Sequence, residues 1–171
     1  MALIVGAGLG AAFTVRAHRQ SEKTASGESY AYTETAEDHE NRCTLSIDCS
    51  SVLMHEDCLS DAQLAYIPGN GMILEESVIG FQTGETAFDI AVRVCGQMGI
   101  ALEYSTTPLT GSSYIEGINQ LYEFDCGELS GWKFSVNGEW PNIASTDYKL
   151  SDGDVLVWYY TCDGVTEYTT E

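Results

Sequence analysis

The sequence feature that most constrains the fold is the stretch "GWKFSVNGEWPN", residues 131–142. Asn137 and Gly138 lie between two runs of β-forming residues, and this dipeptide is typical of the type I′ turn of a β-hairpin. A two-residue turn fixes the register of both arms, and side chains alternate along a strand. We therefore expect Trp132 on the core face of the hairpin. Trp140 falls on the opposite face, where either another segment of the chain or a ligand is expected to pack against it.

The rest of the sequence predicts an α+β fold, a β-grasp-like mixed sheet with one main helix. The last predicted strand is apolar on both faces, which is typical of a strand in the middle of its sheet, and we expect its Trp158 in the core. In the β-grasp plan the first and last strands run side by side at the centre. Besides the hairpin, apolar runs predict strands at residues 43–49, 77–82, 100–105 and 155–161.

The clearest helix of the sequence starts after Thr86 and ends at Gly99. Thr86 and Asp89 have the spacing of a capping box, and Gly99 supplies the left-handed residue that often ends a helix. A shorter helix is expected within residues 51–66, whereas residues 106–131, rich in Gly, Ser and Tyr, are expected to form a long irregular loop, of the kind that is usually functional or disordered. The apolar stripe predicted for the main helix consists of Phe88, Ala91, Val92, Cys95 and Met98.

The N-terminal part of the chain differs in composition from the rest. Residues 1–17 contain an uncharged apolar run that is short for a membrane span and suits a truncated signal peptide or membrane anchor. Residues 18–42 are rich in Ser, Thr and Glu and are predicted to be a disordered polar linker. The folded domain is then expected over residues 43–168, secreted or held at the cell surface, with membrane contact only through the N-terminal anchor.

Charge and cysteine content limit the partners and the compartment. The chain has 26 acidic and 7 basic residues, net charge −19, which disfavours nucleic acid and anionic lipid as partners. All six cysteines follow residue 42 and none forms a C-x-x-C pair, which disfavours zinc and indicates disulfides in an oxidising compartment. Six cysteines allow about 15 connectivities. The β-grasp plan places Cys49 and Cys162 at the same end of neighbouring strands, as candidates for one disulfide.

The sequence offers little of what an enzyme or a metal site needs. His55 is the only histidine after residue 42, and no G-x-S-x-G elbow is present. The many carboxylates supply pairs for glycoside hydrolysis and oxygen ligands for calcium. Pairs such as Asp152 and Asp154 fit a turn better, however, and no EF-hand loop is present. We therefore expect no enzymatic activity, no catalytic residue and no metal site.

Three stretches carry a resemblance to a known family: "TGETAFDIAVRVC", "YIEGINQLYEFDCGELSGWKFSVNGEWPN" and "YKLSDGDVLVWYYTCD". On these motifs, residues 43–168 resemble the DUF4430 family, the transcobalamin-like C-terminal domain of bacterial surface and secreted proteins. The resemblance implies a β-grasp-like fold and the binding of cobalamin, another corrinoid or another large planar ligand. His55 does not lie in the D-x-H-x-x-G motif expected for corrinoid ligation, so the resemblance implies binding through face and edge contacts.

Aromatic residues in the last third of the chain define the candidate ligand site. The predicted ligand-binding residues are Trp140 and Lys133 of the hairpin, Asn137 of its turn, and Tyr114 and Tyr122 of the long loop. Flat aromatic surface beside amide and hydroxyl groups suits a corrin ring, a sugar face or a protein partner. One alternative is that the loop seals these aromatics as a second small core. The rival function is a structural or adhesive cell-surface module that binds protein or glycan.

Overall fold

The computed structural model describes residues 27, 29–32 and 39–164. The predicted signal peptide or anchor at residues 1–17 and most of the predicted linker lie outside these residues. Within the described part of the chain, no helix is both long enough and apolar enough to cross a membrane.

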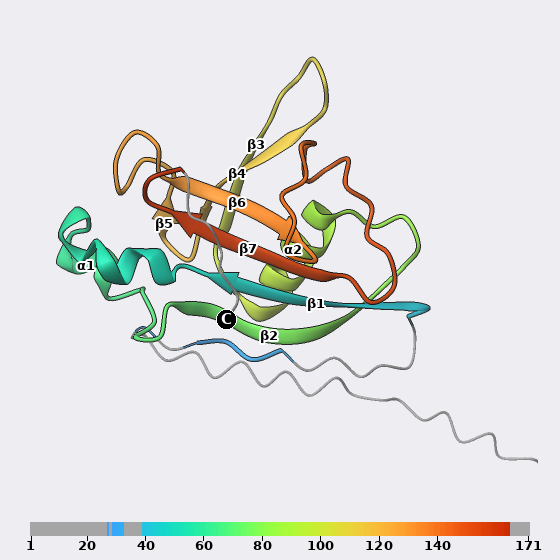
Figure 1. Cartoon of the computed structure of the whole chain (residues 1–171), viewed down its shortest axis with the longest axis horizontal. Helices are drawn as coiled ribbons and strands as arrows, with labels where there is room; N and C mark the ends of the chain where they lie inside the picture. Colours follow the sequence, from blue (N-terminus) through green and yellow to red (C-terminus); the bar gives the residue numbers. More distant parts are fainter. Residues whose placement is uncertain (1–26, 28, 33–38, 165–171) are drawn as a thin grey trace, which may run out of the picture.

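A four-stranded mixed sheet forms the centre of the fold (Figure 1). Its strand order is β2-β1-β7-β6, so the first and last strands of the chain lie side by side in the middle. These two strands are parallel, with Leu45 opposite Leu156, which confirms the predicted β-grasp-like α+β fold. The bounds are β1 (Asn41–Asp48), β2 (Met72–Phe81), β6 (Gly131–Val136) and β7 (Val155–Thr161).

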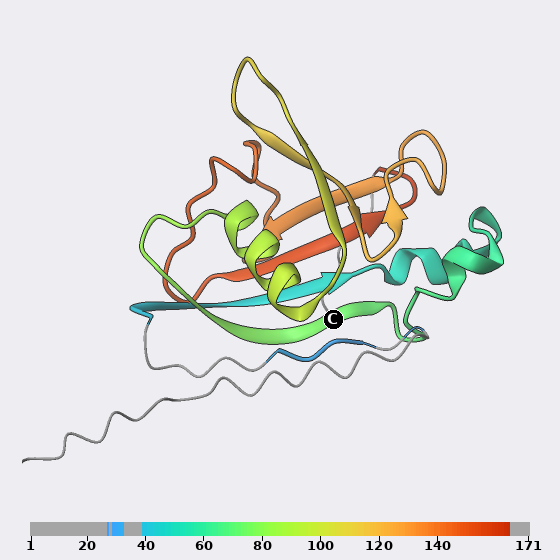
Figure 2. The same cartoon turned by 180° about the vertical axis from the view of Figure 1, so that it is seen from behind.

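Helix α2 (Ala87–Met98) covers one face of this sheet (Figure 2). The predicted ends are confirmed: Thr86 and Asp89 form a complete capping box, and Gly99 ends the helix in the left-handed conformation at φ 73°. The buried face of the helix differs in part from the prediction. Ile90 and Val94 face the sheet and are buried. The predicted core residues Phe88, Val92 and Met98 are only half-buried. The buried residues of the helix are Ala87, Ile90, Ala91, Val94 and Cys95.

The stretch predicted as a long loop contains a second, antiparallel sheet, so that prediction was wrong. Ser113–Ile118 forms β4, which pairs with β3 (Leu102–Thr106) on one side and with β5 (Leu121–Tyr122) on the other. Two of its apolar residues, Ile115 and Ile118, are buried in the common core. β4 pairs with β3 in a hairpin whose connection spans only residues 107–112, and the Gly and Ser residues on either side of β4 obscured this strand in the sequence. The second sheet crosses β6 and β7 on the same side as α2 (Figure 2).

The β1–β2 connection contains the expected short helical structure. It forms two 3₁₀ helices, Ser50–Met54 and Glu56–Cys58, followed by α1 (Asp61–Leu64). A disulfide joins Cys58 of this segment to Cys126, with the two Cα atoms 4.9 Å apart.

The predicted pairing of Cys49 with Cys162 is not formed, since both are free thiols. Cys49 is fully buried at the end of β1, where the chain turns into a 3₁₀ helix, and the Cys162 sulfur lies 3.7 Å from Ser51 Oγ. The β1–β7 pairing ends at Asp48 opposite Tyr159, so both cysteines lie beyond the paired part of the two strands. The disulfide instead ties the β1–β2 connection to the segment between β5 and β6.

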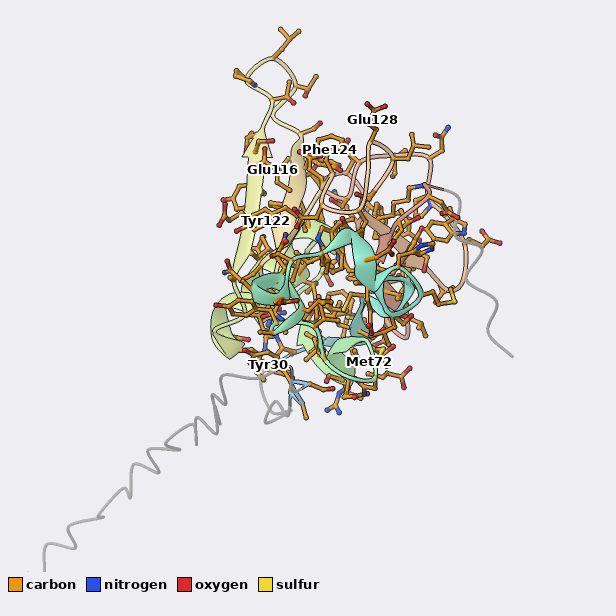
Figure 3. All side chains as sticks on the ribbon, turned by 90° about the vertical axis from the view of Figure 1, so that its left-hand side faces the viewer. Tyr30, Met72, Glu116, Tyr122, Phe124 and Glu128 are labelled. Atoms are coloured by element: carbon orange, nitrogen blue, oxygen red, sulfur yellow. A yellow bond between two sulfur atoms is a disulfide. The ribbon has the colours of Figure 1, made fainter. Side chains whose placement is uncertain are left out.

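Residues 29–32 of the predicted linker lie along the outer edge of β2. The Tyr30 amide donates to the Ile73 carbonyl at 2.8 Å, and the Glu75 amide donates to the Tyr30 carbonyl at 3.0 Å. Figure 3 shows Tyr30 at the same end of the molecule as Met72, the first residue of β2. These contacts satisfy backbone groups of an edge strand that would otherwise face solvent.

Candidate functional site

A cavity of about 510 Å³ lies beside β6. Residues of β4, β6 and β7 line it together with residues from the segment that follows the β6 turn. Its volume falls in the range of about 300–1,000 Å³ that is usual for small-molecule sites. The elements described above explain its position, because the second sheet crosses over β6 beyond the part of the central sheet that α2 covers (Figure 2).

The inner wall of the cavity is aromatic. Trp132 and Phe134 come from β6, and Trp158 comes from the neighbouring β7, where it pairs with Phe134 across the sheet. The Phe134 and Trp158 rings are tilted by 31° with their centroids 5.4 Å apart. Trp132 and Trp158 are each only 3% exposed, so both belong to the core while one part of each contributes to the cavity wall.

Two exposed aromatic residues stand at the cavity. Trp140 is 42% exposed and Tyr114 is 46% exposed, and both line the cavity. The Trp140 ring contacts the Tyr159 ring edge-to-face, with the centroids 4.2 Å apart. This contact holds the indole in one orientation without burying it. Burial, followed by the charge and hydrogen bond of Glu123, raises the pKa of Tyr114 to about 12, so its hydroxyl is neutral at physiological pH.

The polar lining is rich in hydroxyl groups and poor in charge. Lys133 is the only charged residue among the described residues that line the cavity, although the chain as a whole carries 26 acidic residues. Its ammonium group donates a hydrogen bond to the Gly164 carbonyl. The hydroxyl-bearing residues of the lining, apart from Tyr114, are Thr107, Ser112, Ser113 and Ser145.

The two buried tryptophans of the wall differ in their hydrogen bonding. Trp132 Nε1 donates to the Leu121 carbonyl at 2.9 Å. Trp158 Nε1 is also buried but has no hydrogen-bond partner among the described residues. A buried donor without a partner costs about 1–3 kcal/mol, and such groups are rare in folded proteins.

The structure brings together three of the five predicted ligand-binding residues. Trp140, Tyr114 and Lys133 all line the cavity. Tyr122 does not: its hydroxyl donates to Glu103 Oε1 at 2.6 Å, and its ring packs against Gly117 of the neighbouring strand. Figure 3 shows Tyr122 and Glu116 along the ribbons of the second sheet.

Asn137 stabilises the hairpin turn and does not line the cavity. It has φ 54° and Gly138 has φ 78°, as the predicted type I′ turn requires. Its amide nitrogen donates to Asp154 Oδ1 at 2.9 Å, and its side-chain oxygen accepts from the Val155 amide at 2.9 Å. Both side-chain groups are therefore used to join the hairpin turn to the start of β7.

The sequence prediction missed several residues of the site. Trp132 and Trp158 were assigned to the core alone, because strand alternation shows which face a side chain takes but not where the packing on that face ends. Ser145 and Ile143 follow the hairpin in an irregular segment without a recognisable pattern. Only the high density of aromatic residues near the hairpin pointed to this part of the chain.

Within residues 27, 29–32 and 39–164, no group of three or more His, Cys, Asp or Glu side chains is placed to hold a metal ion. Three of the free cysteines, Cys43, Cys49 and Cys95, are buried, and burial raises the pKa of the Cys49 and Cys95 thiols to about 12. These two thiols are therefore unreactive at neutral pH.

Fold and cavity together define a β-grasp-like α+β domain with an aromatic-lined cavity beside an edge strand of its main sheet. Residues 84–162 match the family described as "Domain of unknown function (DUF4430)". The match runs from just before α2 to just after β7, and it includes every residue that lines the cavity.

No curated protein matches the sequence. Among solved structures, one similar chain is the crystal structure of a "putative metal binding protein from Ruminococcus gnavus", at 16% identity and a TM-score of 0.42. The alignment covers 71% of this chain and 97% of the other. A similarity this distant carries no information about the ligand.

Proposed function

We propose that the domain is a non-catalytic binding module whose ligand enters the cavity beside β6. The observation that carries this proposal is the continuity of aromatic surface from the exposed Trp140 and Tyr114 to the buried Trp158. An exposed indole held against Tyr159 offers a flat contact surface with little conformational entropy left to lose on binding. Among the described lining residues there is no His, Asp or Glu to act as a base beside the lining serines, which supports binding rather than serine-based nucleophilic chemistry.

We further infer that the domain is related to transcobalamin-like domains, which makes cobalamin the first ligand to test. The match to residues 84–162 supports this relationship. A cavity of about 510 Å³ accommodates one edge or side group of a corrin rather than the whole ring. The broad face of the ring would then lie against the exposed Trp140 and Tyr114.

The proposed location is outside the cytoplasm, either secreted or at the cell surface. The disulfide between Cys58 and Cys126 supports this location, because structural disulfides are formed and kept in oxidising compartments.

The test is a titration of the full chain with cyanocobalamin, followed by the absorption spectrum and by thermal unfolding. We expect a shift of the cobalamin absorption bands and a higher unfolding temperature, both reduced in Trp140→Ala. Tyr66→Ala is the matched control, since Tyr66 is also a half-exposed aromatic residue but does not line the cavity. No spectral or thermal change at about 0.1–1 mM ligand, where binding of about −4 to −5 kcal/mol is detectable, would refute cobalamin as the ligand.

A second candidate function is that of an adhesive surface module. Leu109, at the end of the β3–β4 hairpin, is 93% exposed, and Tyr104 on β3 is also exposed. An apolar side chain presented in this way suits contact with a protein partner. This function predicts that Leu109→Asp abolishes adhesion to a cell surface while ligand binding at the cavity is unchanged.

A further inference from the structure

We propose that the cavity binds an extended peptide segment of a partner protein, which pairs as an added strand with the free edge of β6, the side of that strand that does not face β7. The inference rests on the proposed function, because it concerns the same cavity. It goes further in naming the class of ligand and the backbone groups that hold it. A peptide is an alternative to cobalamin as the occupant.

The direction of the backbone groups of β6 follows from its pairing. In an antiparallel strand, successive residues point their N–H and C=O groups to opposite edges. Ser135 pairs with Val157 of β7, and the Asn137 amide donates to the Val155 carbonyl at 2.9 Å, so these residues face β7. Phe134 lies one position away from Ser135. Its N–H and C=O therefore point to the free edge.

The second arm of the hairpin covers the free edge only at its start. Val136 and Glu139 exchange two backbone hydrogen bonds, at 2.9 and 3.0 Å. The same register would place Phe134 opposite Pro141, but proline has no N–H to donate. The chain leaves the edge at this point. No group in the described part of the chain hydrogen-bonds to the Phe134 N–H or C=O.

The cavity lies where the second arm leaves β6. Its lining combines Lys133 and Phe134 of β6 with Pro141 and Ile143 of the segment that departs, and Phe134 is only partly buried. Unpaired backbone groups on an edge strand form a template for another strand. At the opposite edge of the main sheet, by contrast, Tyr30 already bonds to β2. The free edge at Phe134 thus offers a peptide both a donor and an acceptor.

The walls of the cavity suit the alternating side chains of a strand. A residue paired with Phe134 points its side chain to the same face of the sheet, where Phe134 and Trp158 line the cavity. Its two neighbours point to the other face, where Trp140 contacts Tyr159, the partner of Lys133. Aromatic surface on both faces favours an apolar residue at the paired position and β-branched neighbours.

Charge favours a segment without acidic residues. The net charge of −19 attracts a basic partner and repels an acidic one at long range. No carboxylate belongs to the described lining of the cavity, so a cation inside it would lose its hydration without gaining a counter-charge. The residue paired with Phe134 is therefore uncharged, and basic residues of the partner lie outside the paired part.

Hydrogen exchange of the ¹⁵N-labelled full chain tests the free edge without any ligand. We expect the Phe134 amide to exchange at least about tenfold faster than the amides of Ser135, which faces β7, and Val136, which bonds to Glu139. A slowly exchanging Phe134 amide would overturn the inference, because the free edge would already be occupied.

The ligand probe is the capped peptide Lys-Thr-Val-Tyr-Val-Thr-Lys, whose tyrosine is meant to pair with Phe134. We expect exchange of the Phe134 amide to slow on binding. Methylation of the tyrosine backbone nitrogen removes the N–H that donates to the Phe134 carbonyl and weakens binding about tenfold, the size of one hydrogen bond. Methylation of the following valine nitrogen is the matched control, since that N–H points away from β6 and its loss changes affinity less than about twofold.

The outcomes separate this inference from the proposed function. Equal losses for the two methylated peptides would overturn pairing as a strand. Binding that perturbs the cavity amides but leaves the Phe134 amide in fast exchange would keep the cavity as a binding site and refute the inference. No peptide binding at about 1 mM would also refute it, while a response to cyanocobalamin would still support the cavity as the site.

Pro141→Val tests why the edge is free. Valine supplies the N–H that proline lacks, so the hairpin arm extends and pairs with Phe134. We expect slower exchange at Phe134 in the free variant and about tenfold weaker peptide binding. Pro108→Val is the matched control, since Pro108 is exposed and does not line the cavity. Thermal unfolding shows whether each variant is folded. Equal behaviour of the two folded variants would contradict the inference.

Discussion

At the scale of the residue, the two tryptophans of the hairpin have different roles. Trp132 is buried, donates to the Leu121 carbonyl and contacts the Tyr160 ring edge-to-face at 5.3 Å. Trp140 is partly exposed and contacts Tyr159. The separation of the two rings follows from strand alternation and a two-residue turn, so this part of the site is predictable from sequence.

The two tryptophans therefore respond differently to truncation. We expect Trp132→Ala to lower the free energy of unfolding by about 3–5 kcal/mol, as for other large-to-small changes in a core. Trp140→Ala is expected to cost only about 1 kcal/mol, the size of one aromatic pair, while it weakens ligand binding. Denaturant unfolding of both variants measures the difference. A larger loss of stability for Trp140→Ala than for Trp132→Ala would contradict the assignment.

Tyr160 makes the stability of the domain sensitive to alkaline pH. Its hydroxyl donates to the Tyr122 carbonyl at 2.7 Å, and burial raises the pKa of Tyr160 to about 12. Above pH 10 the unfolded chain loses this proton while the folded protein keeps it, so stability falls between pH 10 and about 12. The slope for one proton is about 1.4 kcal/mol per pH unit. Unfolding free energies over this range are expected to fall less steeply for Tyr160→Phe than for the unchanged protein.

At the scale of the element, sequence signals were accurate where they are local. The capping box of Thr86 and Asp89, the stop at Gly99 and the bounds of β7 were all predictable, since each depends on neighbouring residues. β4 was missed although it forms a short hairpin with β3, because Gly and Ser residues surround its few apolar positions. The missing partner of Trp158 Nε1 has a different origin: it is a property of packing and has no signature in sequence.

The disulfide links two irregular elements, and its removal has a predictable cost. Cys58 and Cys126 are 68 residues apart, and closing a loop of this length stabilises the folded state by about 4 kcal/mol in the chain-entropy description. We expect the double variant Cys58→Ser, Cys126→Ser to unfold at correspondingly lower denaturant concentration. Cys162→Ser, which removes a free thiol, is the control.

The connectivity itself can be read from the oxidised protein by peptide mapping. The structure predicts a peptide pair joined through Cys58 and Cys126. A bridge between Cys49 and Cys162 in its place would show that the sequence-based pairing was right and that the end of β1 is arranged differently.

At the scale of the whole molecule, the order of elements was enough to predict the main sheet and its helix, although not the second sheet. A central last strand, one capped helix and a tight hairpin leave few alternatives to a β-grasp-like sheet, which the order β2-β1-β7-β6 confirms. The cavity was only partly predictable. It depends on how the second sheet crosses the first, and this arrangement is set by the core residues Ile115 and Ile118 together with the main sheet.

The central claim is that the cavity beside β6 is the ligand site, and amide chemical-shift mapping of the full chain tests it most directly. Cyanocobalamin and cellobiose are titrated separately, and perturbed amides are placed on the structure. We predict perturbations concentrated in residues 112–115, 132–134 and 140–145, which surround the cavity. Perturbations concentrated instead on the exposed residues Phe124 and Leu129 between β5 and β6, with the cavity residues unchanged, would contradict the account.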